Sequence, residues 1–303
     1  MSNFVTPSAI DIETVHGLCN ASCIMCAINS SSERPQIMPR DMFLGILDRL
    51  MPYMKQIEYL NLVGLGEATL DPDVYAKICA AKDAGFHQVC LPTNGGMLDK
   101  TRASHLLHTG IDIVIFSIDS LIPERFEQIR PGLSFQRVIE NIHGFIKLRN
   151  EGNYATAICV RMIEQALNKK EWQAYTNYWS NYLVSNKGDM VLRFPQHNWA
   201  DAEYVIPKSV SCPYVFDRIT INVSGMIQFC CIDVDASFYT LGSAFHDDPV
   251  GVFNNDAFRQ ARLLMKKGRI NDLEHCSRCD VPLKRLRRGA ADLRRQDTLT
   301  DAG

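Results

Sequence analysis

Three cysteines lie close together near the N-terminus, where the stretch CNASCIMC contains Cys19, Cys23 and Cys26. The spacing is too tight for two of them to form a disulfide without strain, and the stretch lacks the second ligand pair of a structural zinc site. Three thiolates on one loop can instead hold three irons of a four-iron, four-sulfur cube. The fourth iron would stay open, so the motif predicts a cluster that binds a substrate or cofactor directly.

The whole chain has eleven cysteines in 303 residues. Their odd number argues against a disulfide framework, and metal ligation is the alternative in a reducing cytoplasm. The N-terminus has no signal-peptide pattern, and the most apolar run, IDIVIFSI, is shorter than the roughly 20 residues that a membrane helix needs. The formal net charge of −2 gives the protein no overall positive potential that would attract nucleic acid or an anionic membrane. We therefore expect a cytoplasmic protein without nucleic-acid or membrane partners.

The elements that must position the cysteines alternate between strand-like and helix-like patterns. Helical periodicity fills the gaps between apolar, β-branched stretches at residues 11–17, 57–64, 87–95, 111–119, 155–163 and 189–195. Repeated strand–helix–strand units form parallel sheets with right-handed crossovers. We therefore predict an α/β fold in which residues 1–200 form a partial (β/α)6 barrel of the TIM type. Barrels of this type bind ligands at the carboxyl ends of their strands, where the three cysteines are expected.

The pattern changes after residue 200. The stretch RITINVSGMIQFCC predicts a β-hairpin around a Val-Ser-Gly turn, and a helix and a loop with the sequence CSRC follow it. We expect residues 201–285 to form a second, smaller domain. Residues 286–303 form a basic tail, which we interpret as a solvated helix face rather than a nucleic-acid site.

A Cys-x3-Cys-x2-Cys motif after the first strand of a βα barrel resembles the radical S-adenosylmethionine (SAM) superfamily. The resemblance implies that the open iron chelates the amino and carboxylate groups of SAM. It also implies that a flavodoxin- or ferredoxin-type reductant drives cleavage of SAM to methionine and a 5′-deoxyadenosyl radical. Met25 departs from the family, because this position is usually aromatic and lies against adenine, although a thioether can also cover a purine.

Further motifs lie where that family keeps its SAM-binding residues. GLGEATLDP, after the second strand, resembles its Gly-Gly-Glu motif, in which glycines allow close approach of the backbone and a carboxylate pairs with the methionine ammonium. An arginine on the fifth strand suits the SAM carboxylate, whereas turn and capping chemistry is the alternative role for Asn94 and Asp119. The implied SAM pocket consists of Gly64, Gly66, Glu67, Asn94, Ser117, Asp119 and Arg161.

Cysteines in the C-terminal third resemble the SPASM/twitch extension of radical SAM enzymes, which carries auxiliary iron–sulfur clusters. No cysteine follows Cys279, so the shortened twitch form with one auxiliary four-iron cluster fits better. Four ligands close such a cluster, which suits electron transfer rather than substrate binding, and a zinc site is the alternative. The implied ligands are Cys212, Cys230, Cys276 and Cys279.

Cys231 directly follows one of these implied ligands. If residues 218–231 are extended, Cys230 and Cys231 face opposite sides. A thiol donates a hydrogen atom readily because its S–H bond is weak, and a radical epimerase needs such a donor. The alternative is that Cys231 only packs.

The spacing of these motifs is similar to that of the twitch-type 2-deoxy-scyllo-inosamine dehydrogenases. The resemblance implies oxidation of a carbinol carbon to a ketone, with an electron passed to the auxiliary cluster and a proton to a base. We expect the barrel to begin within the first dozen residues, without a leader-peptide-binding domain, which favours a small molecule such as an aminocyclitol, sugar or antibiotic precursor. A radical epimerase, a peptide-modifying maturase and an iron–sulfur carrier remain alternatives. The candidates for the base are Arg193, His197, Glu164 and Asp233.

Overall fold

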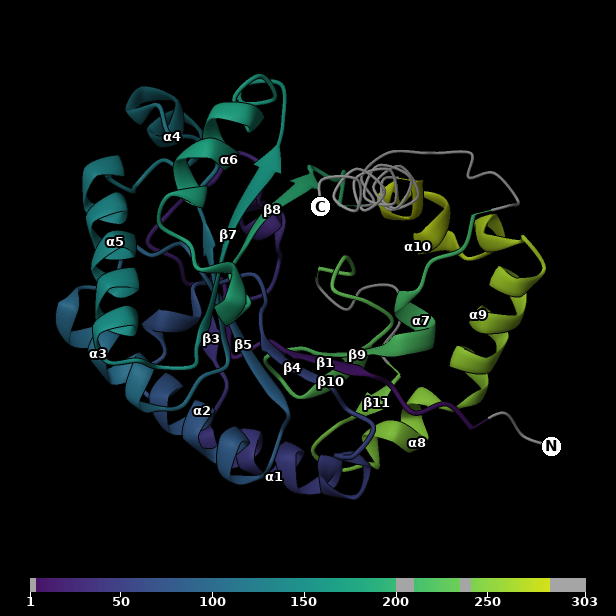
Figure 1. Cartoon of the computed structure of the whole chain (residues 1–303). Helices are drawn as coiled ribbons and strands as arrows, with labels where there is room; N and C mark the ends of the chain where they lie inside the picture. Colours follow the sequence, from purple (N-terminus) through teal and green to yellow (C-terminus); the bar gives the residue numbers. More distant parts are fainter. Residues whose placement is uncertain (1–3, 200–209, 235–240, 284–303) are drawn as a thin grey trace, which may run out of the picture.

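A computed structural model describes residues 4–199, 210–234 and 241–283, so the predicted basic tail lies outside the described residues. The main sheet of this part of the chain has the strand order β11-β10-β9-β1-β4-β5-β6-β7-β8 (Figure 1). The predicted partial barrel is confirmed, because six strands of the sheet pair in parallel in chain order. These strands are β1 (Ala9–Ile12), β4 (Tyr59–Leu62), β5 (Gln88–Thr93), β6 (Ile113–Ser117), β7 (Ala157–Glu164) and β8 (Met190–Pro195).

Amphipathic helices cover the outer face of this sheet (Figure 1). In α5, for example, the buried residues Val138, Ile142 and Phe145 recur at helical spacing, so one stripe packs on the strands. The helices of the barrel are α1 (Arg40–Leu50), α2 (Val74–Asp83), α3 (Lys100–His108), α4 (Pro123–Ile129), α5 (Phe135–Glu151) and α6 (Trp172–Ser180). None of the described helices combines the length and apolar character that a membrane span needs.

The first strand is shorter than the sequence pattern predicted. It ends at Ile12, and β2 (Val15–His16) pairs with β3 (Gln36–Ile37) in a separate two-stranded ladder. The prediction of one strand over residues 11–17 was wrong, because a run of β-branched residues does not specify which partner each residue takes. The chain therefore leaves the main sheet just before the three N-terminal cysteines.

The predicted hairpin is present, as β9 (Arg218–Ile221) and β10 (Met226–Gln228) pair antiparallel. Gly225 in the turn has φ +78°, a left-handed conformation that glycine adopts without strain. Moreover, β9 pairs in parallel with β1, so the hairpin and β11 (Gly242–Ser243) extend the sheet of the barrel. The remaining helices of this region are α7 (Tyr214–Asp217), α8 (Pro249–Phe253), α9 (Asp256–Lys266) and α10 (Glu274–Ser277).

Candidate active site

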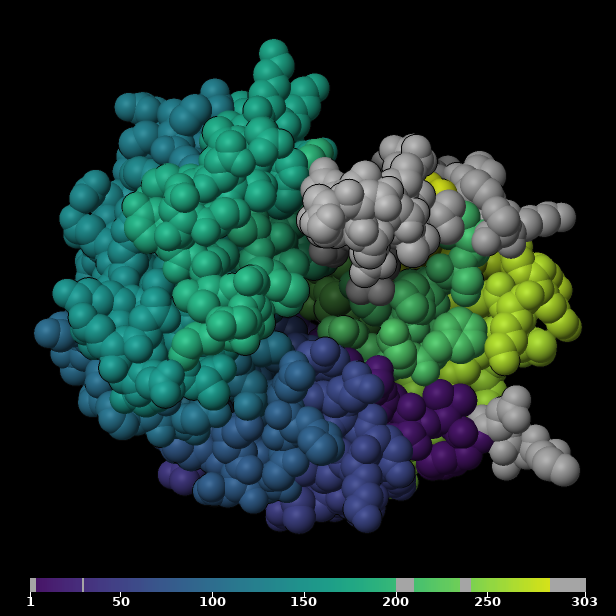
Figure 2. Space-filling view, in the orientation of Figure 1, coloured from purple at the N-terminus to yellow at the C-terminus, as the bar shows by residue number. Residues whose placement is uncertain are grey.

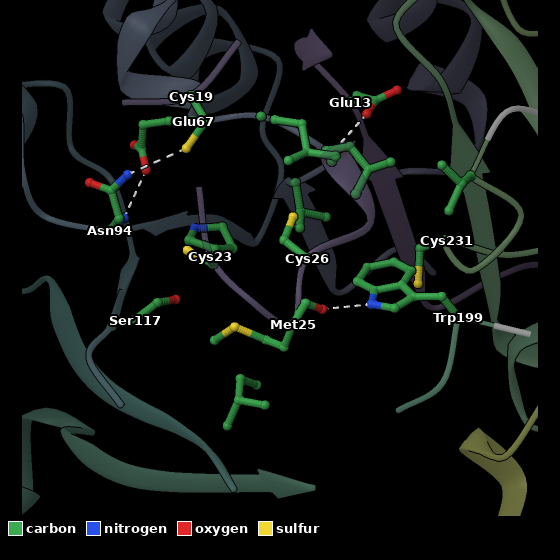
Figure 3. Close-up of a pocket in the computed structure, with 18 of the residues that line it drawn as sticks. Glu13, Cys19, Cys23, Met25, Cys26, Glu67, Asn94, Ser117, Trp199 and Cys231 are labelled. Carbon is green, nitrogen blue, oxygen red and sulfur yellow. Dashed lines mark hydrogen bonds between the residues drawn. The ribbon is translucent and has the colours of Figure 1, made fainter. Parts of the chain in front are cut away.

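A cavity of about 340 Å³ lies inside the partial barrel, in the size range of small-molecule sites. Figure 2 shows the surface hollowed between the teal segment of the later barrel strands and the green segment of the hairpin. The lining of the cavity includes Cys19, Cys23 and Cys26 from the N-terminal motif and Cys231 from the segment after β10 (Figure 3). Cysteines that are about 200 residues apart in the sequence thus meet at one cavity.

The three N-terminal cysteines have protonated thiols when no metal is bound. Burial raises the pKa of Cys19 to about 11 and also raises the pKa of Cys23 and Cys26, while their mutual repulsion adds to the effect at Cys19 and Cys23. This repulsion requires that the three sulfur atoms lie near one another. Iron ligation needs thiolates, so binding of a cluster here would release protons.

Arg161 and Ser117 lie on neighbouring strands β7 and β6 and both line the cavity. Arg161 Nη2 donates to Ser117 Oγ at 2.6 Å, whereas Arg161 Nε is buried without a hydrogen-bond partner among the described residues. A buried guanidinium N–H without a partner costs free energy unless a ligand accepts from it. The cavity therefore fits a carboxylate-bearing ligand such as SAM.

Glu67 lines the cavity, but its carboxylate already accepts several hydrogen bonds from the protein. Thr69 Oγ1 and Thr93 Oγ1 donate to Oε1 at 2.6 and 2.7 Å, and the backbone N–H of Asn94 donates to Oε2 at 2.8 Å. The side chain also caps the short helix η3 (Ala68–Leu70) through the backbone N–H of Thr69. In this structure Glu67 holds together the loops after β4 and β5, and a contact with the SAM ammonium stays a prediction.

Asn94 lies beside the N-terminal motif, as Figure 3 shows. Its Nδ2 donates to Asn20 Oδ1 at 2.7 Å and lies 3.7 Å from Cys19 Sγ. Asn94 Oδ1 accepts from the backbone N–H of Gly96, which is a turn contact of the kind that the alternative reading predicted. One side chain therefore serves the turn and contacts the cysteine loop.

Asp119 is not among the described residues that line the cavity, and its place in a SAM pocket stays a prediction. It is fully buried, accepts from the backbone N–H of Ile163 at 2.7 Å and pairs with Arg130 Nη2 at 2.8 Å. Arg130, which the sequence analysis missed, lines the cavity and donates from Nη1 to Cys23 Sγ at 3.4 Å. Asp119 therefore acts on the cysteine loop through Arg130.

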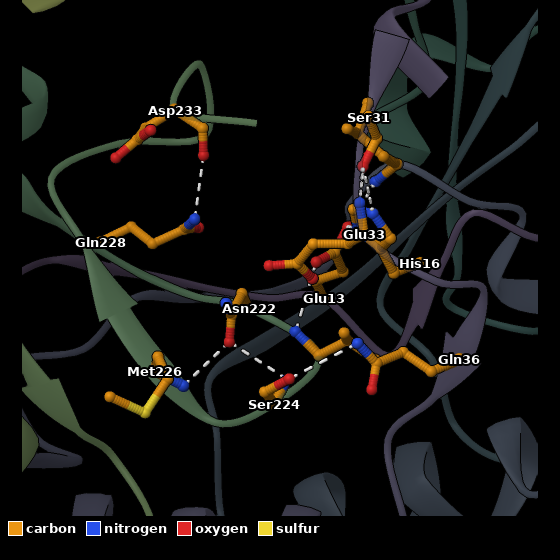
Figure 4. Close-up of polar contacts among 12 residues, drawn as sticks. Glu13, His16, Ser31, Glu33, Gln36, Asn222, Ser224, Met226, Gln228 and Asp233 are labelled. Carbon is orange, nitrogen blue, oxygen red and sulfur yellow. Dashed lines mark hydrogen bonds and ion pairs between the residues drawn. The ribbon is translucent and has the colours of Figure 1, made fainter. Parts of the chain in front are cut away.

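Glu13 is a second cavity residue that the sequence did not single out, and it joins three segments (Figure 4). Its Oε1 accepts from the backbone N–H of Leu65 at 2.7 Å and hydrogen-bonds to His16 Nδ1 at 3.0 Å, and its Oε2 accepts from the N–H of Val223 at 3.2 Å. A Cβ on Gly64 would lie 2.2 Å from Glu13 Cγ. Any larger residue at position 64 would therefore clash with the buried Glu13 side chain.

Gly66 has an equally specific reason to be glycine. A Cβ at this position would lie 2.5 Å from the backbone oxygen of Val15. We predict that Gly66→Ala lowers the free energy of unfolding by about 1–3 kcal/mol, because the backbone of β2 must shift to make room. Gly144→Ala is the control: apart from the backbone of α5 and the two chain neighbours, no atom of the described residues lies within 4 Å of a Cβ there, and alanine should stabilise the helix by about 0.5–1 kcal/mol. Urea unfolding of both variants checks this, and equal stabilities would contradict the predicted clash.

The four C-terminal cysteines Cys212, Cys230, Cys276 and Cys279 influence one another. Burial raises the pKa of Cys279 to about 12 and raises the pKa of Cys230 and Cys276, and repulsion from Cys212 adds to each of the three shifts. No three His, Cys, Asp or Glu side chains of the described part of the chain meet at a single-ion site. Thiolates of a four-iron cube each bind a different iron and need not meet at one point.

Cys231 faces the cavity, whereas its neighbour Cys230 belongs to the C-terminal set. Burial raises the pKa of Cys231 to about 12, and the charge of Asp11 adds to this effect. The thiol therefore keeps its hydrogen at neutral pH in the absence of metal. His197 and Asp233 also line the cavity.

Arg193 and Glu164 are not among the described residues that line the cavity, and a catalytic role for either stays a prediction. They form an ion pair, and the Arg193 guanidinium lies 5.3 Å from the centre of the Trp172 ring on α6. Arg193 is in register with Met162, which belongs to the core. Because successive side chains of a strand alternate in direction, both charged residues lie on the outer face.

Family models match two parts of the chain. The model described as "Radical SAM superfamily" matches residues 14–161, and the SPASM model, described as an iron–sulfur cluster-binding domain, matches residues 212–280. Residues 14–161 therefore form a radical SAM domain, and residues 212–280 form a SPASM domain. The radical SAM domain implies SAM and a four-iron cluster, and the SPASM domain implies an additional iron–sulfur cluster.

Solved structures share this fold at low sequence identity. BtrN in complex with AdoMet and 2-DOIA aligns with a TM-score of 0.64 and 16% identity, over 91% of this chain and 93% of BtrN. SuiB of Streptococcus suis bound to its precursor peptide SuiA aligns with a TM-score of 0.61 and 13% identity, over 84% of this chain and 66% of SuiB. The likeness to BtrN thus extends over nearly the full length of both chains.

Curated relatives match a shorter part. A tungsten-containing aldehyde ferredoxin oxidoreductase cofactor-modifying protein of Pyrococcus furiosus is 30% identical over 55% of this chain and 48% of its own length. A probable GTP 3′,8-cyclase of Sulfurisphaera tokodaii is 31% identical over 44% of this chain and 42% of its own length. The chain thus spans about half the length of the curated relatives that it matches.

Proposed function

We propose that the chain is a radical SAM oxidoreductase that dehydrogenates a hydroxyl-bearing carbon of a small molecule, such as an aminocyclitol, a sugar or an antibiotic precursor. The observation that carries the proposal is the shared cavity. It is lined by Cys19, Cys23 and Cys26 and also by Cys231, which directly follows the proposed auxiliary ligand Cys230. A substrate there would lie between the source of the radical and an electron acceptor, as a two-electron oxidation requires. The whole-chain likeness of fold to BtrN, solved with AdoMet and 2-DOIA, also supports a small substrate.

The proposed reaction removes one hydrogen atom, one proton and one electron from the substrate. A cluster held by Cys19, Cys23 and Cys26, together with bound SAM and an electron from a flavodoxin- or ferredoxin-type donor in the cytoplasm, would supply the radical chemistry that takes the hydrogen atom from the carbinol carbon. We assign His197 as the base that accepts the hydroxyl proton, because Arg193 and Glu164 lie outside the cavity. An imidazole nitrogen that carries no proton can accept one in this step. The remaining electron leaves toward the region of Cys230, and the substrate becomes a ketone.

A radical epimerase is the second candidate, and the position of Cys231 favours it. The thiol lines the cavity beside Trp199, where a substrate radical would be within its reach (Figure 3). In this reaction Cys231 returns a hydrogen atom to the opposite face of the carbon. The inverted alcohol is then the product, and no electron is removed from it.

One experiment distinguishes the two reactions. The anaerobically reconstituted enzyme is incubated with SAM, a reductant and a panel of aminocyclitols and nucleotide sugars in heavy water. A dehydrogenase yields a carbonyl product, and Cys231→Ala continues to form it. An epimerase places one deuterium at the inverted carbon, and Cys231→Ala diverts the reaction to an oxidised product. Cys79→Ala is the control, because Cys79 is exposed on α2. If no 5′-deoxyadenosine forms from SAM, both proposals fail.

A further inference from the structure

The segment that follows β8, residues 196–199, contacts the loops of both cysteine sets, and we name it the strap. The third residue of the strap, Asn198, forms three hydrogen bonds with the CSRC loop and Asp280. The backbone N–H of Asn198 donates to Asp280 Oδ1 at 3.1 Å, and the backbone N–H of Asp280 donates to Asn198 Oδ1 at 3.2 Å. Asn198 Nδ2 also donates to the backbone carbonyl of Arg278 at 2.8 Å. Arg278 and Asp280 flank the proposed auxiliary ligand Cys279.

The end of the strap is fixed to the other loop. Trp199 Nε1 donates to the backbone carbonyl of Met25 at 2.8 Å, between Cys23 and Cys26 (Figure 3). Trp199 has φ +53°, a left-handed conformation that costs a bulky residue free energy and persists only where the surroundings fix it. Its ring also contacts that of His197 at a centroid distance of 4.3 Å. The indole is therefore held in place by two contacts and by its own backbone.

The two residues of the strap that contact the cysteine loops are close together in the chain. Asn198 and Trp199 are adjacent, and one residue spans at most about 3.6 Å of chain. A displacement of the CSRC loop must therefore move the Met25 carbonyl or break one of the hydrogen bonds. The strap also lines the cavity through His197 and Trp199, so the coupled segment is part of the site itself.

We propose that Asn198 and Trp199 are positioning residues that couple the auxiliary-cluster loop to the SAM-cluster loop. The inference rests on the proposed function only in taking these two loops to hold the two clusters. Because coupling between two binding sites is reciprocal, the auxiliary loop affects SAM affinity, and bound SAM affects the auxiliary cluster. Both effects pass through the indole N–H and the Asn198 amide.

A double-mutant cycle on SAM binding tests the coupling without substrate. Isothermal titration calorimetry of the anaerobically reconstituted holoenzyme measures the Kd of SAM for wild type, Trp199→Phe, Asn198→Ala and the double variant. Trp199→Phe should raise Kd by about threefold to tenfold, the range for one lost hydrogen bond, and Asn198→Ala, which removes two, should raise it by at least as much. The double variant should be no weaker than the weaker single variant, because the strap is already detached. Trp172→Phe, on α6 outside the cavity, should leave Kd unchanged.

The reciprocal effect is measured on the auxiliary cluster by a redox titration followed by EPR. Addition of SAM should shift its midpoint potential in the wild type, and Trp199→Phe should abolish the shift. An unchanged Kd in Asn198→Ala, multiplying effects in the double variant, or a SAM-induced shift that persists in Trp199→Phe would each overturn the inference. If Asn198→Ala fails to load the cluster, the Trp199→Phe titration decides alone. A failure here leaves the proposed dehydrogenation standing, because no substrate is used.

Discussion

Replacing Arg130 by methionine is expected to lower the free energy of unfolding by about 3–5 kcal/mol, as found when one partner of a buried ion pair is removed. The guanidinium lies 2.8 Å from Asp119, and these residues are only 6% and 0% exposed. Methionine fills much of the same volume but leaves the Asp119 carboxylate buried without its counter-charge. The substitution also removes the N–H donated to Cys23 Sγ. Urea unfolding of the anaerobically reconstituted protein measures the change.

Lys147→Met is the matched control for this substitution. Lys147 forms an exposed pair with Glu151 on α5, and such surface pairs contribute about 0–1 kcal/mol. Adding Asp119→Asn to Arg130→Met should restore part of the lost stability, because a neutral amide is less costly to bury than a carboxylate. If Arg130→Met were as stable as Lys147→Met, the ion pair would not hold the cysteine loop.

The barrel and the hairpin could be predicted because both depend on local patterns. Period-2 and helical stretches alternate along residues 9–195, and Val-Ser-Gly marks the turn between β9 and β10. The pairing of β9 with β1 could not be predicted, because it joins strands about 200 residues apart. No local pattern specifies that Asp11 accepts two hydrogen bonds from Arg218 on the neighbouring strand. The extension of the barrel sheet by the C-terminal hairpin therefore comes from tertiary contacts alone.

In the candidate site, too, some residues could be predicted from local patterns, whereas others depend on tertiary contacts. Residues that follow strand ends, such as Asn94, reach the cavity because parallel strands place their carboxyl ends together. The outward position of Arg193 and Glu164 could not be predicted, because a one-residue change of register moves a side chain to the other face of a sheet. Arg130 and Trp199 lie in loops, and neither belongs to a spacing motif that would have indicated a cavity residue. Their positions depend on hydrogen bonds to Cys23 and Met25 across the fold.

His197→Phe is expected to reduce formation of the oxidised product by about 10²–10⁴-fold, the usual contribution of a general base. The ring keeps its contact with Trp199, but it no longer accepts a proton in the cavity. Cleavage of SAM to 5′-deoxyadenosine should continue, uncoupled from product, because this step does not need the base. Single-turnover assays measure both products.

Glu164→Gln and Arg193→Met are the controls, because their ion pair lies on the outer face of the same two strands. Both variants should keep the wild-type rate of product formation, since neither side chain can reach the substrate. If His197→Phe kept the wild-type rate of product formation and Asp233→Asn lost it, the base would be Asp233, the other candidate that lines the cavity. If Glu164→Gln or Arg193→Met lost that rate instead, the register of β7 and β8 would be wrong. The contrast between the two faces thus tests the chemistry and the placement of the strands together.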